Sequence, residues 1–78
     1  MGARLPVKRV APGLDGLTGR ELEIVRLVSR RQSNKEIGVQ LDISARTVGT
    51  HLANVFDKTG IRDRTALGDL AREQGLHR

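Results

Sequence analysis

Between Ser33 and Lys58 the chain carries side chains that can pair with negative charge or donate hydrogen bonds, and few that could catalyse a reaction. These candidate binding residues are Asn34, Lys35, Arg46, Thr47, Thr50, His51, Asn54 and Lys58. The chain has no Cys and no Tyr, and its two histidines, His51 and His77, are far apart. It also lacks a glycine-rich loop of the kind that cradles phosphates. We therefore expect a binding protein without cofactor or metal, and not an enzyme.

The charge balance indicates what these side chains could bind. Lys and Arg number 14 against 9 Asp and Glu, so the 78 residues have a net charge of +5. Such an excess on one small domain favours a polyanion, either nucleic acid or an anionic membrane surface. Phe56 is the only aromatic residue, so single-stranded bases have no platform to stack on. Duplex DNA is the better prediction, and a basic domain with no charged partner is the alternative.

The residues from Ala45 to Lys58 should form the helix that positions most of the candidates. Val48, Leu52, Val55 and Phe56 recur at helical spacing and make one apolar stripe. The opposite side carries Arg46, Thr50, Ala53, Asn54 and Asp57, with Gly49 at its edge and Thr47, His51 and Lys58 along a flank. A helix that buries one side and presents small hydrogen-bonding groups on the other can lie in a DNA major groove.

Three helix starts are signalled in a row. Thr18 and Ser33 each stand three residues before a glutamate, which is the capping-box pattern, and Ser44 caps the helix that follows it. Asn34 and Lys35 then occupy the first turn of the second helix, where free N–H groups favour a phosphate. Gly38 is costly inside a helix, and we expect a close approach of the neighbouring helix to require it.

A fourth helix is predicted from Arg64 to Gln74, with Asp63 as its cap and Gly75 as its stop. Ala66, Leu67, Leu70 and Ala71 would form its apolar stripe. The opposite side would carry a dimer interface, or else a solvated face, made of Thr65, Gly68, Asp69 and Arg72. The predicted fold class is all-α: a tri-helical helix-turn-helix core with a C-terminal fourth helix.

Residues 1–16 read as a flexible basic tail or linker, because Pro and Gly interrupt them and no apolar period is present. They could instead form an arm that touches DNA phosphates. The domain proper would then be residues 17–78. No apolar run approaches the ~18 residues that span a bilayer, and the N-terminus does not resemble a secretion signal.

From Leu17 to Leu76 the chain resembles the LuxR-type (GerE/FixJ-like) DNA-binding domains. The matching segments are LTGRE at 17–21, SNKEI at 33–37, L-x-IS-x-x-TV-x-x-HL-x-N-V-x-x-K at 41–58, and the Gly60-Ile61 turn followed by Arg64. The resemblance implies a cytoplasmic bacterial transcription regulator, often a response regulator, with its third helix in the major groove. It also implies a homodimer on DNA through the fourth helix, and RNA polymerase as a further partner.

By position, the resemblance implies phosphate contacts from Asn34 and Lys35 and from three residues of the third helix: Thr47, His51 and Lys58. It places Arg46 and Thr50 near base edges. The chain departs from the family pattern at Gly19, where Pro is usual, and at Gly49, where Lys is usual. The alternative function is a protein-interaction module that uses the same fold to dock polymerase or another regulator.

Overall fold

The computed structural model describes Leu14 and residues 16–76. Within them the chain forms α2 (Gly19–Ser29), α3 (Asn34–Leu41), α4 (Ala45–Thr59) and α5 (Arg64–Glu73), and no strand. The all-α prediction is confirmed, and the two predicted helix ends, Lys58 and Gln74, each differ from the observed ends by one residue. The predicted tail lies almost entirely outside the described residues.

The helix boundaries follow from local side chains, as predicted. Thr18 and Ser33 form reciprocal capping boxes with Glu21 and Glu36. Ser44 caps α4 by accepting a hydrogen bond from the Thr47 N–H, and Asp63 caps α5 in the same way through the Thr65 N–H. Gly60 ends α4 in the left-handed conformation, with φ 76°, which costs glycine least.

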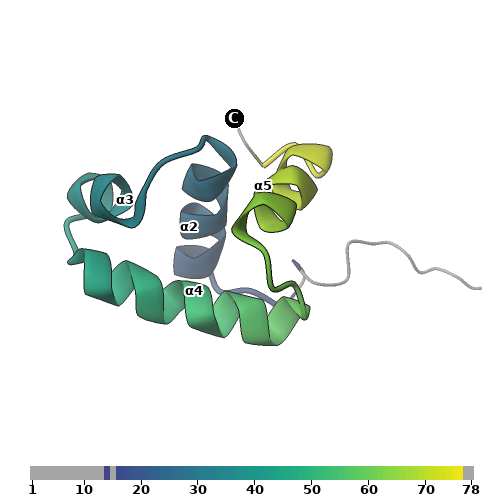
Figure 1. Ribbon diagram of the computed structural model, residues 1–78, viewed down its shortest axis with the longest axis horizontal. Coiled ribbons are helices and arrows are strands. Elements are labelled where there is room, and N and C mark those ends of the chain that lie inside the picture. Colours follow the sequence, from purple (N-terminus) through teal and green to yellow (C-terminus); the bar gives the residue numbers. More distant parts are fainter. Residues whose placement is uncertain (1–13, 15, 77–78) are drawn as a thin grey trace, which may run out of the picture.

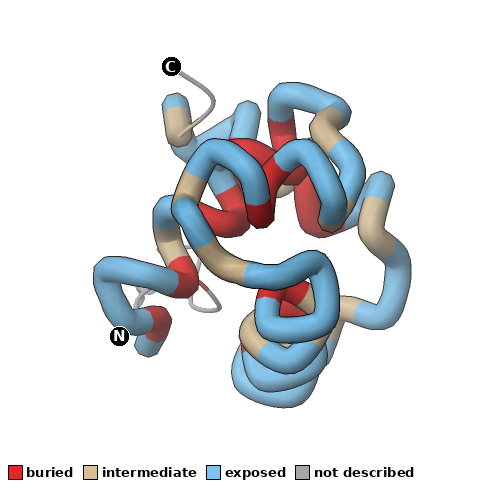
Figure 2. The backbone as a smooth tube through the Cα atoms, turned by 90° about the vertical axis from the view of Figure 1, so that its left-hand side faces the viewer, coloured by how far each residue is buried: buried red, intermediate tan, exposed pale blue. Residues whose placement is uncertain are grey.

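The helices are arranged around α2 (Figure 1). The longest helix, α4, runs along one edge of the molecule, and α2 stands on it with its C-terminal end pointing away. In this view α3 lies to one side of α2 and α5 to the other, so that α2 packs against α5 and α4, while α3 packs mainly on α4. Figure 2 shows that the buried segments meet between the helices and that α4 and the turns are exposed on their outer sides.

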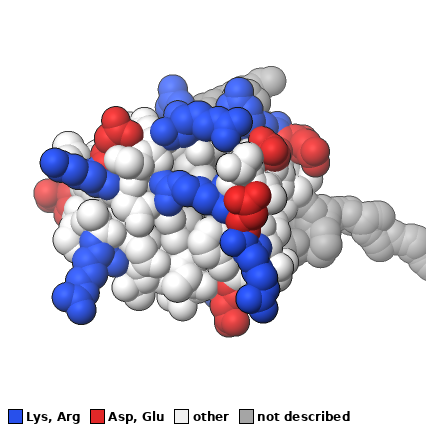
Figure 3. Space-filling model, in the orientation of Figure 1, with Lys and Arg blue, Asp and Glu red and all other residues white. Residues whose placement is uncertain are grey.

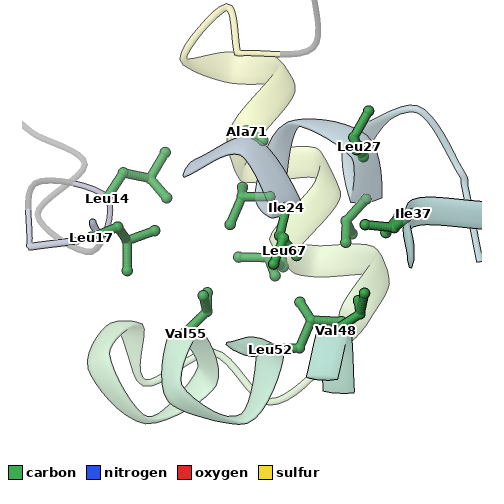
Figure 4. Packing of buried hydrophobic residues seen from close by; sticks show 12 residues of the cluster. Leu14, Leu17, Ile24, Leu27, Ile37, Val48, Leu52, Val55, Leu67 and Ala71 are labelled. Carbon is green, nitrogen blue, oxygen red and sulfur yellow. The ribbon is translucent and has the colours of Figure 1, made fainter. Parts of the chain in front are cut away.

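The core is aliphatic and drawn from all four helices (Figure 4). Ile24 and Leu67 meet at its centre, Val48, Leu52 and Val55 point up from α4, and Ile37 enters from α3. The predicted stripe of α4 is therefore confirmed, with Phe56 half-buried at its end. Leu14, which lies within the predicted tail, is buried against this core at 9% exposure.

None of the helices in the described part of the chain is long and apolar enough to cross a membrane.

Candidate nucleic-acid interface

The turn between α3 and α4 brings the two helices unusually close. A Cβ added at Gly38 would lie 2.6 Å from the Ile43 carbonyl oxygen and 3.2 Å from the Ala45 nitrogen. Both are backbone atoms, so neither can move aside cheaply. Asp42 takes the left-handed conformation, and the Ile43 N–H bonds back to the Gly38 carbonyl at 2.9 Å. The expected reason for Gly38 is thus confirmed, and the turn fixes α4 across α3.

The outer side of α4 is exposed along most of its length. Arg46, Thr50 and Asn54 are exposed and His51 is half-buried. Thr47 lies beside the cap, its hydroxyl 2.9 Å from that of Ser44, and the Thr50 hydroxyl donates to the Arg46 carbonyl at 3.3 Å. These hydroxyls keep lone pairs and can rotate, so this side remains available to a ligand.

The first turn of α3 carries the predicted pair Asn34 and Lys35. Lys35 is exposed, whereas Asn34 is half-buried and its side chain accepts a hydrogen bond from a residue of another helix. The Arg64 guanidinium, at the start of α5, donates to Asn34 Oδ1 at 2.7 Å and to the Gln32 carbonyl at 2.7 Å. Since a guanidinium only donates, it fixes the amide with Nδ2 turned away from it. We did not assign Arg64 to the site, although it belongs to the matching pattern.

Lys58 has a partner that we did not predict. Its Nζ lies 2.8 Å from Oε1 of Glu21, and the side chains are 40% and 6% exposed respectively. The same oxygen accepts the Thr18 N–H at 2.9 Å in the capping box of α2. The hydrogen bond from Lys58, followed by that from Thr18, lowers the pKa of Glu21 below its ordinary value of 4.5. The charge of Lys58 is therefore compensated within the domain.

Our prediction of which residues of α5 face outward is partly wrong. Gly68 is buried, and a Cβ there would lie 3.4 Å from the Ser29 Cα of α2. Gly68 therefore allows α5 to pack closely against α2. Ala66, which we placed in the core, is exposed. Arg72 donates to the Ser29 carbonyl at 2.9 Å, and Asp69 lies 3.9 Å from the Arg31 guanidinium. Thr65, Asp69 and Arg72 are exposed.

Figure 3 shows the face that has α4 along its lower edge. Its area over α4 is mostly uncharged and has Lys and Arg side chains around it, while acidic side chains stand at the upper left and left edge, at the right and at the lower edge. Among the described residues no group of three His, Cys, Asp or Glu could hold a metal ion. The Lys and Arg side chains beside this uncharged area suit contact with the phosphates of a duplex.

Two capped helices, α3 and α4, cross at a tight turn that requires Gly38 and pack on a core drawn from four helices. This arrangement defines a helix-turn-helix domain. The sequence model of the bacterial regulatory proteins of the luxR family matches residues 15–71. The chain belongs to that family. This result confirms the resemblance, and the family is one of DNA-binding transcription regulators.

Individual relatives agree with the family match. The chain is 47% identical over 68 residues to a candidate HTH-type transcriptional regulator of Mycobacterium bovis. The aligned region covers 87% of this chain and 8% of that protein. It is 47% identical over 62 residues to the transcriptional regulatory protein LiaR of Bacillus subtilis, covering 80% and 29%. With the response regulator protein VraR of Staphylococcus aureus it shares 39% over 59 residues, covering 76% and 28%. The chain thus spans less than a third of these relatives.

Proposed function

We propose that the chain binds duplex DNA in a sequence-specific manner, with α4 in the major groove, as part of bacterial transcription regulation. The observation that carries the proposal is the exposed outer side of α4, set beside the exposed Lys35 in the first turn of α3 by the Gly38 turn. A helix with small polar groups can enter the groove, while the end of the preceding helix meets the phosphates. The net charge of +5 supports the same partner.

The proposed roles divide by position. Arg46, Thr50 and Asn54 lie on the exposed side of α4 and would read base edges. Phosphate contacts are assigned to Asn34, Lys35, Thr47, His51 and Lys58. Lys58 is the weakest of these, because its ion pair with Glu21 would have to be shared or given up. Asn34 can still offer Nδ2 after Arg64 has taken its oxygen.

The proposal includes a homodimer on DNA, formed through the exposed side of α5. Thr65, Asp69 and Arg72 can contribute to such a contact, and Gly68 cannot, because it faces α2. Regulators of this kind act at the promoter, so RNA polymerase is a further proposed partner in the cytoplasm.

The deciding experiment is a selection of bound sequences from a random duplex pool with the 78-residue chain. The expected result is an enriched site made of two half-sites related by two-fold symmetry, since operator symmetry follows protein symmetry. Enrichment of a single, asymmetric half-site would remove the dimer from the proposal. No enrichment at low salt would contradict DNA binding and favour the alternative of a protein-interaction module.

A further inference from the structure

A hollow of about 350 Å³ lies between α4, the start of α3 and the segment that leads into α5. One wall belongs to α4 and is formed by Gly49, Leu52, Ala53 and Phe56. The other wall is polar and is formed by Asn34, Arg62 and Arg64. The hollow therefore borders both the groove-facing helix and the proposed phosphate contacts, without coinciding with any residue of α4 assigned to base reading.

The wall on α4 offers no hydrogen-bonding side chain. Gly49 has no side chain, Ala53 is an exposed methyl group, and Phe56 is half-buried, so part of its ring faces outward. A Cβ at position 49 would lie 3.7 Å from Asn34 Nδ2, which shows how near the polar wall stands. In the major groove the thymine 5-methyl is the apolar group that distinguishes one base pair from another, and Ala and Phe are among the residues that contact it.

The opposite wall carries positive charge without a carboxylate to compensate it. Arg64 is half-buried, yet both of its hydrogen-bond acceptors are neutral: the Asn34 amide and the Gln32 carbonyl. Arg62 is exposed, and none of the ion pairs found among the described residues involves Arg62 or Arg64. A partly desolvated guanidinium with neutral partners favours the approach of an anion.

We infer that the walls of the hollow contact one thymidine nucleotide of the bound duplex, through its 5-methyl edge and its phosphate. The 5-methyl group packs against Ala53 and Phe56, and the adjoining phosphate lies between Arg62 and Arg64. The chain then reads a thymine by apolar contact at the place where its Gly49 supplies no basic side chain. This inference rests on the proposed function, because it needs a duplex on α4.

The first test uses the site obtained by selection and replaces each thymine in turn by deoxyuridine, which removes only the 5-methyl group. At one position in each half-site the affinity should fall about fourfold, the loss expected when one methyl-sized group is no longer buried. If the duplex binds and no replacement changes the affinity, the inference is wrong while the proposed function stands. If no duplex binds, both fail.

The second test changes the wall. Ala53→Lys puts a long cationic side chain into the hollow, so the preference for thymine and the sensitivity to deoxyuridine should both disappear. Gln74→Lys adds the same charge at the end of α5 that points away from α4 (Figure 1) and should keep both. Retention of the deoxyuridine effect in Ala53→Lys would overturn the assignment of the methyl group to this wall.

The third test addresses the phosphate. Arg62→Ala should weaken binding to all duplexes and reduce the slope of log affinity against log salt by up to about 0.9, the value for one phosphate, because Arg64 still faces the same phosphate. Arg62 is exposed and has no partner among the described residues, so its removal should leave folding intact. Arg30→Ala removes the same charge at the far end of α2 and should leave the slope unchanged. An unchanged slope in Arg62→Ala would overturn the phosphate contact.

Discussion

At the scale of single residues, Glu21 joins two helices through one oxygen atom. Its Oε1 accepts the Thr18 N–H at the start of α2 and the Lys58 ammonium near the end of α4, 37 residues away. Glu21 is 4% exposed, so these partners replace most of the water that would otherwise solvate the carboxylate. A residue that looks like an ordinary cap in the sequence therefore also ties α4 to α2.

This contact predicts an acid-sensitive contribution to stability. The folded protein lowers the pKa of Glu21 below 4.5, so the contribution is complete above that pH and is lost as the pH falls through the lowered value. Glu21→Gln should reduce the free energy of unfolding at pH 7, and its deficit relative to the wild type should shrink below pH 4.5. Urea unfolding of both proteins between pH 3 and pH 7 measures this difference.

Glu23→Gln is the matched control. Glu23 lies 3.7 Å from Arg20 in an exposed pair whose side chains are 54% and 43% exposed, and such pairs contribute about 0–1 kcal/mol. Its effect should be small at every pH. A deficit of Glu21→Gln that stays constant between pH 3 and pH 7 would contradict the ionic role of Glu21 and leave only a steric one.

At the scale of the elements, the turn between α3 and α4 decides where α4 points. Gly38→Ala puts a methyl group 2.6 Å from the Ile43 carbonyl oxygen. The α3–α4 crossing must then open, at a cost of about 1–3 kcal/mol for an overpacked contact. Thermal unfolding should show a lower Tm, by about 4–8 °C per kcal/mol for a domain of this size, and DNA affinity should fall with it.

Gly49→Ala makes the same chemical change in the next helix, where the nearest atom, Asn34 Nδ2, would be 3.7 Å away. That distance is ordinary contact, so the gain in helix propensity, up to about 1 kcal/mol, should remain. The variant should be as stable as the wild type or more so. If Gly38→Ala raises the Tm by as much as Gly49→Ala does, the close approach does not govern position 38.

The sequence predicted those features of the elements that depend on near neighbours. The caps Thr18, Ser33 and Ser44 each bond to a residue three positions further on. The close approach at Gly38 involves Ala45, seven positions further on, so local patterns reveal all of these features. The apolar stripe of α4 was equally clear, because its spacing repeats over more than two turns of the helix.

What the sequence could not predict are contacts between distant segments. The Lys58 pair spans 37 residues and the bond from Arg64 to Asn34 spans 30. The orientation of α5 was wrong because Ala66 and Gly68 are both small, and only the position of α2 decides which of them is covered. The proposed base and phosphate contacts remain predictions, since they depend on a partner.

At the scale of the whole molecule, the excess of positive charge should appear as salt dependence. Log affinity should fall linearly with log salt, by about 0.9 per neutralised phosphate. Lys35→Ala should weaken every duplex and flatten this slope by about one phosphate, because Lys35 is exposed at the start of α3. Arg46→Ala should instead change the preferred sequence, with a cost of about 1–3 kcal/mol at its base position.

Affinities measured by fluorescence anisotropy over a range of salt concentrations, on the selected site and on its single-base variants, separate the two effects. Lys58→Ala should flatten the slope less than Lys35→Ala, because Glu21 already compensates its charge. If Lys35→Ala and Arg46→Ala shift the preferred sequence equally, the division between phosphate and base contacts is wrong.

The bond from Arg64 to Asn34 joins the first residue of α5 to the first residue of α3. If two copies pair through α5, a rotation of that helix within the pair also moves Asn34 relative to the phosphate proposed to contact it. The angle at which the copies meet would then set the distance between the N-terminal ends of α3 in the two copies, where the phosphate contacts are proposed. We therefore expect an operator whose half-sites are moved apart by one base pair to bind with a different affinity because of this bond, even though the bases proposed to contact α4 are the same.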